Sequence, residues 1–142
     1  MSEDKIEKVD ELIEQFTQSQ SDVQGQIVIS YPQGVPISNS WRGKINPILI
    51  GALSSAVKLT FQNLCKNLRK GNLKRLYMTN EHGRAIIQNA GPKAILTTIA
   101  DKEADLFRIA FRMSNLAIDL KEVLEDFDYN DVSDIKGGGL NG

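Results

Sequence analysis

The longest periodic pattern of apolar residues lies between Asn46 and Gly71 and predicts a long helix. One set recurs at the three- and four-residue spacing of a helix face: Leu49, Leu53, Val57, Phe61, Leu64 and Leu68. Four neighbours widen this stripe beyond the width that one sheet face would cover: Ile48, Ala52, Ala56 and Leu59. Such a helix would be about 35 Å long at 1.5 Å per residue, whereas the flanking strands would span about 20 Å. We therefore expect part of the helix to pack against something other than its own sheet.

Both ends of this segment carry helix-boundary signals. Asn46 suits an N-cap, and Pro47 suits the first turn, where a missing N–H costs nothing. Cations that complement the helix dipole are expected in the last turn, at Lys66, Arg69 and Lys70. Gly71 is expected to close the helix in a left-handed conformation.

Two further helices are predicted by apolar stripes on charged backgrounds. The first covers residues 3–18, with its stripe at Ile6, Val9, Leu12, Ile13 and Phe16. This helix could dock on the domain or bind a partner. The last helix runs from Asp105 to about Glu125, with its buried face at Leu106, Ile109, Ala110, Met113, Leu116, Ala117, Leu120 and Leu124.

Five short segments have the composition of strands: residues 26–30, 35–40, 73–80, 84–89 and 94–100. The first two flank a Tyr-Pro-Gln-Gly turn and are typical of a hairpin, in which Pro36 favours an edge strand. The last three form a meander, with a tight turn at 81–83 in which Gly83 is able to adopt a positive φ. Residues 94–100 are apolar on both faces, so they belong at the centre of the sheet.

This element order predicts an α+β fold, an α-β-α sandwich around a five-stranded antiparallel sheet. The strand order 2-1-5-4-3 lets the long central helix cross one face from edge to edge. The N- and C-terminal helices would then cover the other face. Residues 1–126 would form this domain, and residues 127–142 a flexible, acidic and glycine-rich tail.

The segment VQGQIVISYPQGVPIS at residues 23–38 resembles the roadblock / dynein light-chain family. In that family a V-x-G-x-x-V strand is followed by a turn, a G-x-P-I strand and a long helix. The matching positions here are Val23, Gly25, Val28, Gly34, Pro36 and Ile37. The similarity covers roughly residues 5–124, and a full C-terminal helix makes prokaryotic regulators of Ras-like GTPases the most similar subtype.

The resemblance implies a homodimer in which the third strands pair across a two-fold axis and the long helices pack together. The implied interface residues are Leu73, Arg75, Tyr77 and Thr79 on the third strand, and Leu53, Ala56, Thr60 and Leu64 on the long helix. The residue pattern agrees, since an exposed strand edge must be paired or blocked. The implied function is a non-enzymatic regulator or scaffold of a small Ras-like GTPase. Two alternatives are an adaptor or light chain of a motor or membrane-associated complex, and a ligand-sensing module of the profilin/PAS type.

Composition excludes little beyond this. A net charge of −1 gives no reason to expect a nucleic-acid partner. No apolar run approaches the roughly 20 residues of a membrane span, so no stable membrane insertion is expected. The charged N-terminus does not resemble a signal peptide, and the single cysteine allows no internal disulfide, which makes a cytoplasmic location the default expectation.

No arrangement of residues predicts catalysis, a metal site or a cofactor. The only histidine, His82, falls in a predicted turn, and Cys65 is expected to be a buried structural thiol. The segment before the long helix offers candidate partner-binding residues at Trp41, Arg42 and Lys44. Its cations could bind an anion at the helix N-terminus or form a solvated connector. Trp41 could be an exposed anchor for a partner or could pack over the sheet edge.

Arginines and lysines also gather around the end of the long helix and the third strand, at Lys66, Arg69, Lys70, Lys74 and Arg75. They could form a solvated face, a docking patch for an acidic partner or contacts across the dimer. An arginine finger from Arg42, Arg75 or Arg84 is a minor alternative.

Overall fold

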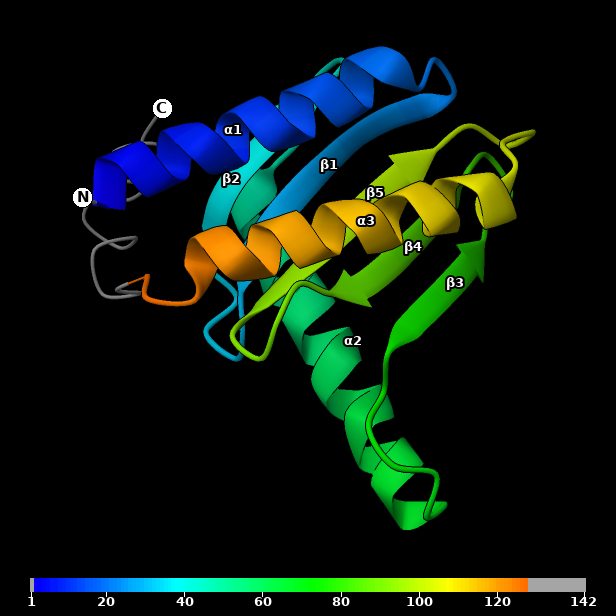
Figure 1. Cartoon of the computed structure of the whole chain (residues 1–142). Coiled ribbons are helices and arrows are strands. Elements are labelled where there is room, and N and C mark those ends of the chain that lie inside the picture. Colours follow the sequence, from blue (N-terminus) through cyan, green and yellow to red (C-terminus); the bar gives the residue numbers. More distant parts are fainter. Residues whose placement is uncertain (1, 128–142) are drawn as a thin grey trace.

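Three helices and five strands make up the part of the chain that the computed structural model describes, residues 2–127 (Figure 1). In chain order they are α1 (Ser2–Ser19), β1 (Val23–Ser30), β2 (Pro36–Trp41), α2 (Pro47–Asn67), β3 (Arg75–Thr79), β4 (Arg84–Asn89), β5 (Ala94–Ala100) and α3 (Leu106–Leu124). The strands form one antiparallel sheet in the order β2-β1-β5-β4-β3. α1 and α3 lie on one face and α2 crosses the other. The predicted architecture and strand order are therefore confirmed.

The two faces of the sheet support cores of very different size. Under α1 and α3, a large cluster includes Val9 and Ile13 of α1 and Met113 and Leu120 of α3, all fully buried. Under α2, the fully packed cluster is confined to Ile27, Ile29, Ile87 and Ile95 of the sheet, with partly buried neighbours around it. The burial of its apolar stripe shows that α1 is docked on the domain.

Side-chain interactions move several element boundaries away from their predicted positions. β3, predicted over residues 73–80, begins at Arg75, because the Leu73 N–H donates to the Gln62 side chain of α2 at 2.8 Å instead of to a strand. β2 extends through Trp41, which is predicted to lie in the connector, because its ring packs across Gly25 of β1. β1 begins at Val23 rather than residue 26.

The predicted caps of α2 are half correct. The Asn46 side chain accepts a hydrogen bond from the Leu49 N–H at 3.2 Å, as expected of an N-cap. The helix ends at Asn67, so Arg69 and Lys70 lie beyond it rather than in its last turn. Arg69 already adopts a left-handed φ of 57°, ahead of Gly71 at 83°. Gly83 does not use the positive φ that a glycine in this tight turn could adopt.

Phe127, predicted to begin a flexible tail, is instead buried against the core under α1 and α3. The rest of the predicted tail, residues 128–142, lies outside the described residues.

Two glycines of the V-x-G-x-x-V and G-x-P-I motifs leave room for close contacts. A Cβ on Gly25 would lie 2.3 Å from the Trp41 ring. Gly34 has a φ of 76° and lies against α2, where a Cβ on Gly51 would lie 2.6 Å from the Gly34 carbonyl oxygen. The close approach between the β1–β2 turn and α2 therefore requires glycine at both positions.

The buried positions of α2 are small or polar (Gly51, Ser54, Ser55 and Lys58), and the partly buried Ile50 and Val57 pack on the sheet beside them. Thr97 of β5 donates a hydrogen bond to the Ser54 hydroxyl at 3.1 Å, and Ser55 donates to the Pro32 carbonyl at 2.9 Å. Lys58 is 6% exposed, with its Nζ 3.6 Å from the centroid of the Tyr31 ring. Burial lowers the pKa of Lys58 below its ordinary value of 10.5.

Within residues 2–127, α2 is the one helix long and apolar enough to cross a membrane, judged by length and composition alone. The sequence prediction concerned an uninterrupted apolar run, and α2 meets this broader criterion although Ser54, Ser55 and Lys58 interrupt its apolar residues. The polar contacts of its inner face nevertheless dock α2 on the sheet.

Replacing Lys58 by methionine should stabilise the fold at neutral pH, because burial of the charged amine costs more than its ring contact returns. Between the lowered pKa of Lys58 and its ordinary value of 10.5, the unfolded wild-type chain binds more protons than the folded chain. Wild-type stability should therefore rise with pH across this window, and the advantage of Lys58→Met should shrink. Chemical denaturation at several pH values measures the difference. Lys102→Met, in an exposed turn, is the control, and a constant difference across pH would contradict the prediction.

Replacing Gly51 by alanine should lower the free energy of unfolding by about 1–3 kcal/mol, the usual cost of inserting a methyl group into a packed contact. The added Cβ would meet a backbone oxygen at 2.6 Å, which cannot rotate away. Gly83→Ala adds the same group where the nearest backbone oxygen is 3.1 Å away, so it should cost less. Equal costs in urea unfolding would argue against the close approach.

Candidate functional site

The outer face of α2 carries a continuous row of exposed apolar side chains. Leu49, Leu53, Leu64 and the capping residue Leu68 are each about half exposed, between 47% and 58%. At 100° per residue, the four predicted interface residues Leu53, Ala56, Thr60 and Leu64 fall within an arc of about 80°. All four are exposed, and they lie opposite the buried Ser54, Ser55 and Lys58. The part of the predicted site that lies on the long helix is thus brought together on one face.

The C-terminal half of α2 also extends past the sheet. Figure 1 shows this half of α2 projecting beyond the strand layer, while its first half crosses behind the sheet. With 21 residues the helix is about 32 Å long at 1.5 Å per residue, close to the predicted length. Its projecting half therefore finds little cover within the described chain, as expected from its length.

β3 is an edge strand whose outer backbone groups face no other strand within the described residues. Its side chains divide between the two faces of the sheet. Leu76 and Met78 pack toward α2. The predicted interface residues Arg75, Tyr77 and Thr79 pair with Gln88, Ile86 and Arg84 of β4, and so lie on the face that α1 and α3 cover.

Leu73, also predicted in the interface, lies before β3 and is partly buried. Its carbonyl accepts a hydrogen bond from the Asn89 side chain at 2.8 Å, and its N–H donates to Gln62. The residue therefore anchors the segment that leads from α2 into β3.

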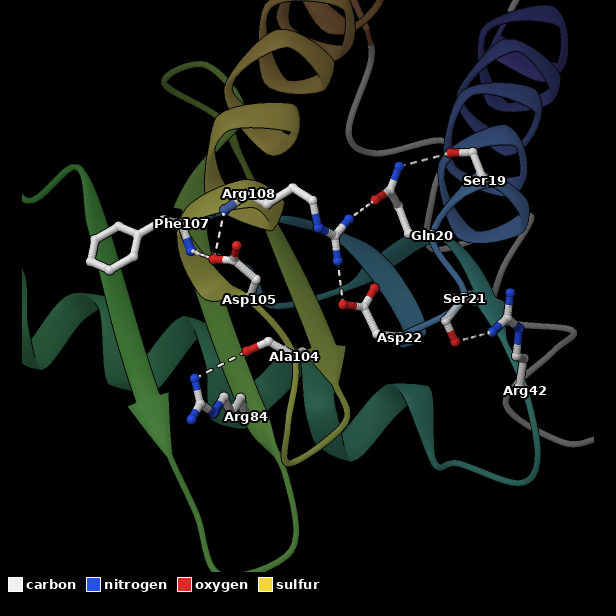
Figure 2. Close-up of polar contacts among 10 residues, drawn as sticks. All are labelled: Ser19, Gln20, Ser21, Asp22, Arg42, Arg84, Ala104, Asp105, Phe107 and Arg108. Carbon is white, nitrogen blue, oxygen red and sulfur yellow. Dashed lines mark hydrogen bonds and ion pairs between the residues drawn. The ribbon is translucent and has the colours of Figure 1, made fainter.

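Trp41, Arg42 and Lys44 are not gathered into one binding site. Trp41 is half-buried over Gly25, as the packing alternative predicts, and its indole N–H is buried without an acceptor among the described residues. The Arg42 guanidinium donates to the Ser21 carbonyl at 3.0 Å (Figure 2) and to the Thr17 carbonyl at 2.7 Å. These two bonds tie the end of β2 to the C-terminal end of α1 and the turn after it. Lys44 is exposed in the connector.

A polar network at the junction of α1, β1 and α3 accounts for another arginine. Arg108 donates to the Gln20 side chain and forms an ion pair with Asp22 (Figure 2). Asp105 caps α3 by accepting from the N–H groups of Phe107 and Arg108, at 3.1 and 3.2 Å. These contacts hold the N-terminus of α3 against the end of α1, which is a structural role.

The residues considered for chemistry are dispersed. His82 is exposed in the turn beside Glu81, with its Nε2 3.7 Å from the Glu81 carboxylate. Cys65 is partly buried in α2 rather than fully buried. Between residues 2 and 127, no three of the histidine, cysteine, aspartate and glutamate side chains converge in a way that could hold a metal ion.

Three exposed apolar residues of α3 were missed by sequence reasoning. Phe107, Phe111 and Ile118 are 83%, 71% and 65% exposed. The available signal was the surplus of apolar positions on this helix, since its buried face accounts for only some of them.

No family model matches the chain. Two uncharacterized proteins from Methanocaldococcus jannaschii are each 25% identical to it over 99 residues, which span 70% of this chain and 85% of each relative.

Solved structures provide a similarity that covers most of the chain. Myxococcus xanthus MglB has a TM-score of 0.79 at 14% identity, covering 87% of this chain and 92% of that structure. MglB from Thermus thermophilus, a gliding protein, has a TM-score of 0.77 at 18% identity, covering 86% and 92%. A roadblock/LC7 domain from Streptomyces avermitilis has a TM-score of 0.75 at 17% identity, covering 82% and 97%. Identities this low establish the fold rather than the function, and the fold of this chain is that of the roadblock/LC7 domains.

Proposed function

We propose that this protein is a homodimeric scaffold that regulates a small Ras-like GTPase and contributes no catalytic chemistry of its own. The observation that carries the proposal is the orientation of α2, which turns serines and a lysine toward the sheet and leucines toward solvent. Burying one leucine side chain contributes about 1.5–3 kcal/mol, so a row of them left in water is a large unrealised stabilisation. Contiguous apolar surfaces of this kind mark interaction sites.

A second copy of the chain fits this surface best. In a two-fold dimer the α2 helices would pack through the same residues on both copies, which is a self-complementary contact. The free edge of β3 would pair with its counterpart and extend the sheet across the axis, which removes an exposed edge. The same two-fold contact would therefore cover both the exposed apolar face of α2 and the free edge of β3.

The GTPase is inferred from similarity. The motif at residues 23–38 resembles prokaryotic roadblock regulators of Ras-like GTPases, and the MglB structures share the fold. A cytoplasmic location belongs to the same proposal. An adaptor or light chain would share the dimer but leave GTP turnover unchanged, and a ligand-sensing module would retain a small molecule.

The dimer can be tested with Leu53→Glu. Wild-type protein should have the mass of a dimer in light scattering at micromolar concentration. Because the two-fold axis removes two leucines at once, the substitution should weaken dimerisation by about 100-fold or more, at about 1.4 kcal/mol for each factor of ten. Lys102→Glu introduces the same charge in an exposed turn and should leave the dimer intact. A wild-type monomer would refute the dimer.

The regulatory role can be tested by measuring single-turnover GTP hydrolysis of Ras-like GTPases from the same organism, with and without the full-length protein. The cognate GTPase should change its rate by about tenfold or more, which corresponds to about 1.4 kcal/mol in the barrier. Leu53→Glu should remove this effect, and Lys102→Glu should preserve it. Binding of a GTPase without any change in hydrolysis or nucleotide exchange would favour the adaptor instead.

A further inference from the structure

A second apolar surface runs along α3, separate from the outer face of α2. Phe107, Phe111 and Ile118 are more exposed than any other large apolar side chains in residues 2–127. Their spacing of four and seven residues places them on one side of the helix, together with Ser114. The Ser114 hydroxyl accepts a hydrogen bond of 2.6 Å from Arg75 of β3. The exposed stripe therefore faces the β3 edge of the sheet.

The sheet beside this stripe is uncovered. In Figure 1, α3 lies over β5 and β4, and no helix lies in front of β3. At the start of α3 a hollow of about 280 Å³ is lined by Tyr77, Arg84, Asp105, Leu106 and Phe107. Tyr77 is 46% exposed on its floor. Figure 2 shows the Phe107 ring pointing away from Arg108, which lies on the α1 side of the helix. The monomer thus presents an apolar wall, the exposed stripe of α3, beside a floor formed by the uncovered face of β3.

The floor carries two arginines, Arg75 and Arg84, and neither forms an ion pair with a carboxylate of residues 2–127. Arg75 donates to the neutral side chains of Gln88, Tyr77 and Ser114. Arg84 donates to the Ala104 carbonyl at 3.0 Å, and its Nε is buried without an acceptor among the described residues. The nearby carboxylate, Asp105, accepts from two N–H groups of its own helix. A ligand that brings carboxylates would therefore complement this floor.

Pairing of β3 with its counterpart would complete the surface. Strands lie about 4.8 Å apart, so the two β4 strands would be separated by about 14 Å and the two α3 axes, which lie over β4 and β5, by about 19 Å. Helices pack at axial distances of about 8–10 Å. The space between the two α3 helices therefore fits one further helix, in contact with both walls and with the paired β3 strands.

We propose that the dimer binds one α-helix of a partner protein in this α3–β3 groove, formed in each copy by Arg75, Tyr77, Arg84, Phe107, Phe111 and Ile118. The bound helix carries apolar residues at helical spacing, flanked by aspartate or glutamate. Its position on the two-fold axis allows one helix for each dimer. A second copy of the chain fits less well, because self-complementary packing of this face would set Arg75 and Arg84 against the same cations. The proposal rests on the proposed dimer and is independent of the GTPase.

The test uses a phage-displayed library of helical peptides of about 18 residues, or five turns, selected against the full-length protein. Enriched peptides should combine an apolar stripe with acidic flanks, and calorimetry should give one peptide per dimer. Phe111→Ser should weaken binding of these peptides by about tenfold or more, since loss of one buried aromatic contact removes at least about 1.4 kcal/mol. Arg75→Gln should weaken binding and reduce its salt dependence. Lysine in place of the acidic residues of the peptide should abolish binding.

Arg112→Gln is the matched control, because it removes the same charge from the α1 side of α3 and should leave affinity unchanged. Light scattering of every variant separates loss of the groove from loss of the dimer. GTP hydrolysis separates both from failure of the regulatory role. The proposal is overturned if no peptide is enriched, if binding survives Phe111→Ser, or if two peptides bind per dimer. It is also overturned if the wild type is a tetramer that Phe111→Ser converts to a dimer, because the occupant is then a second copy.

Discussion

The close approach between α2 and the β1–β2 turn is the constraint on which the rest of the structure depends. Gly34 and Gly51 meet with no room for a side chain, and Ser55 donates a hydrogen bond to the same turn. At this distance the buried positions of α2 hold only small residues and one lysine, whose Nζ lies over the Tyr31 ring, with Ile50 and Val57 partly buried beside them. Most large apolar residues of α2, including all its leucines, are therefore exposed, and the core beneath the helix remains small.

This constraint explains which parts of the structure the sequence predicts. Periodicity identifies the helices, the strands and their order, because it depends on local spacing that survives folding. It identifies the apolar stripe of α2 but not the side that meets the sheet, because that depends on the contact of Gly51 with a turn far away in sequence. An excess of length and apolar surface over the sheet predicts that something else must cover part of the helix. Leu53 and Leu64, which the family resemblance implies as interface residues, are exposed on its outer face.

The predictions that fail do so through single long-range contacts. The Leu73 N–H donates to the Gln62 side chain, so β3 begins two residues later than predicted. The absence of a side chain at Gly25 leaves room for the Trp41 ring, so β2 extends to Trp41. In neither case does the sequence around one residue indicate which distant residue it will contact. The same holds for Arg42, whose position before a helix suggests anion binding but whose guanidinium is taken up by two carbonyl groups at the end of α1. The stripe on α3 was missed for a different reason, since exposed and buried apolar residues on one helix are indistinguishable in composition.

β3 connects the two surfaces that remain open. Because side chains alternate along a strand, Leu76 and Met78 support the packing of α2, while Arg75 and Tyr77 face α3. The free backbone N–H and C=O groups of β3 point along the plane of the sheet, toward neither set of side chains. A partner on the edge would therefore leave both sets of side chains in place, and the dimer that covers α2 would at the same time bring two copies of Arg75 and Tyr77 together on the opposite face. Substitutions of Arg75 or Tyr77 should thus leave the dimer in place, whereas a substitution on α2 that breaks the dimer also separates the two halves of the groove.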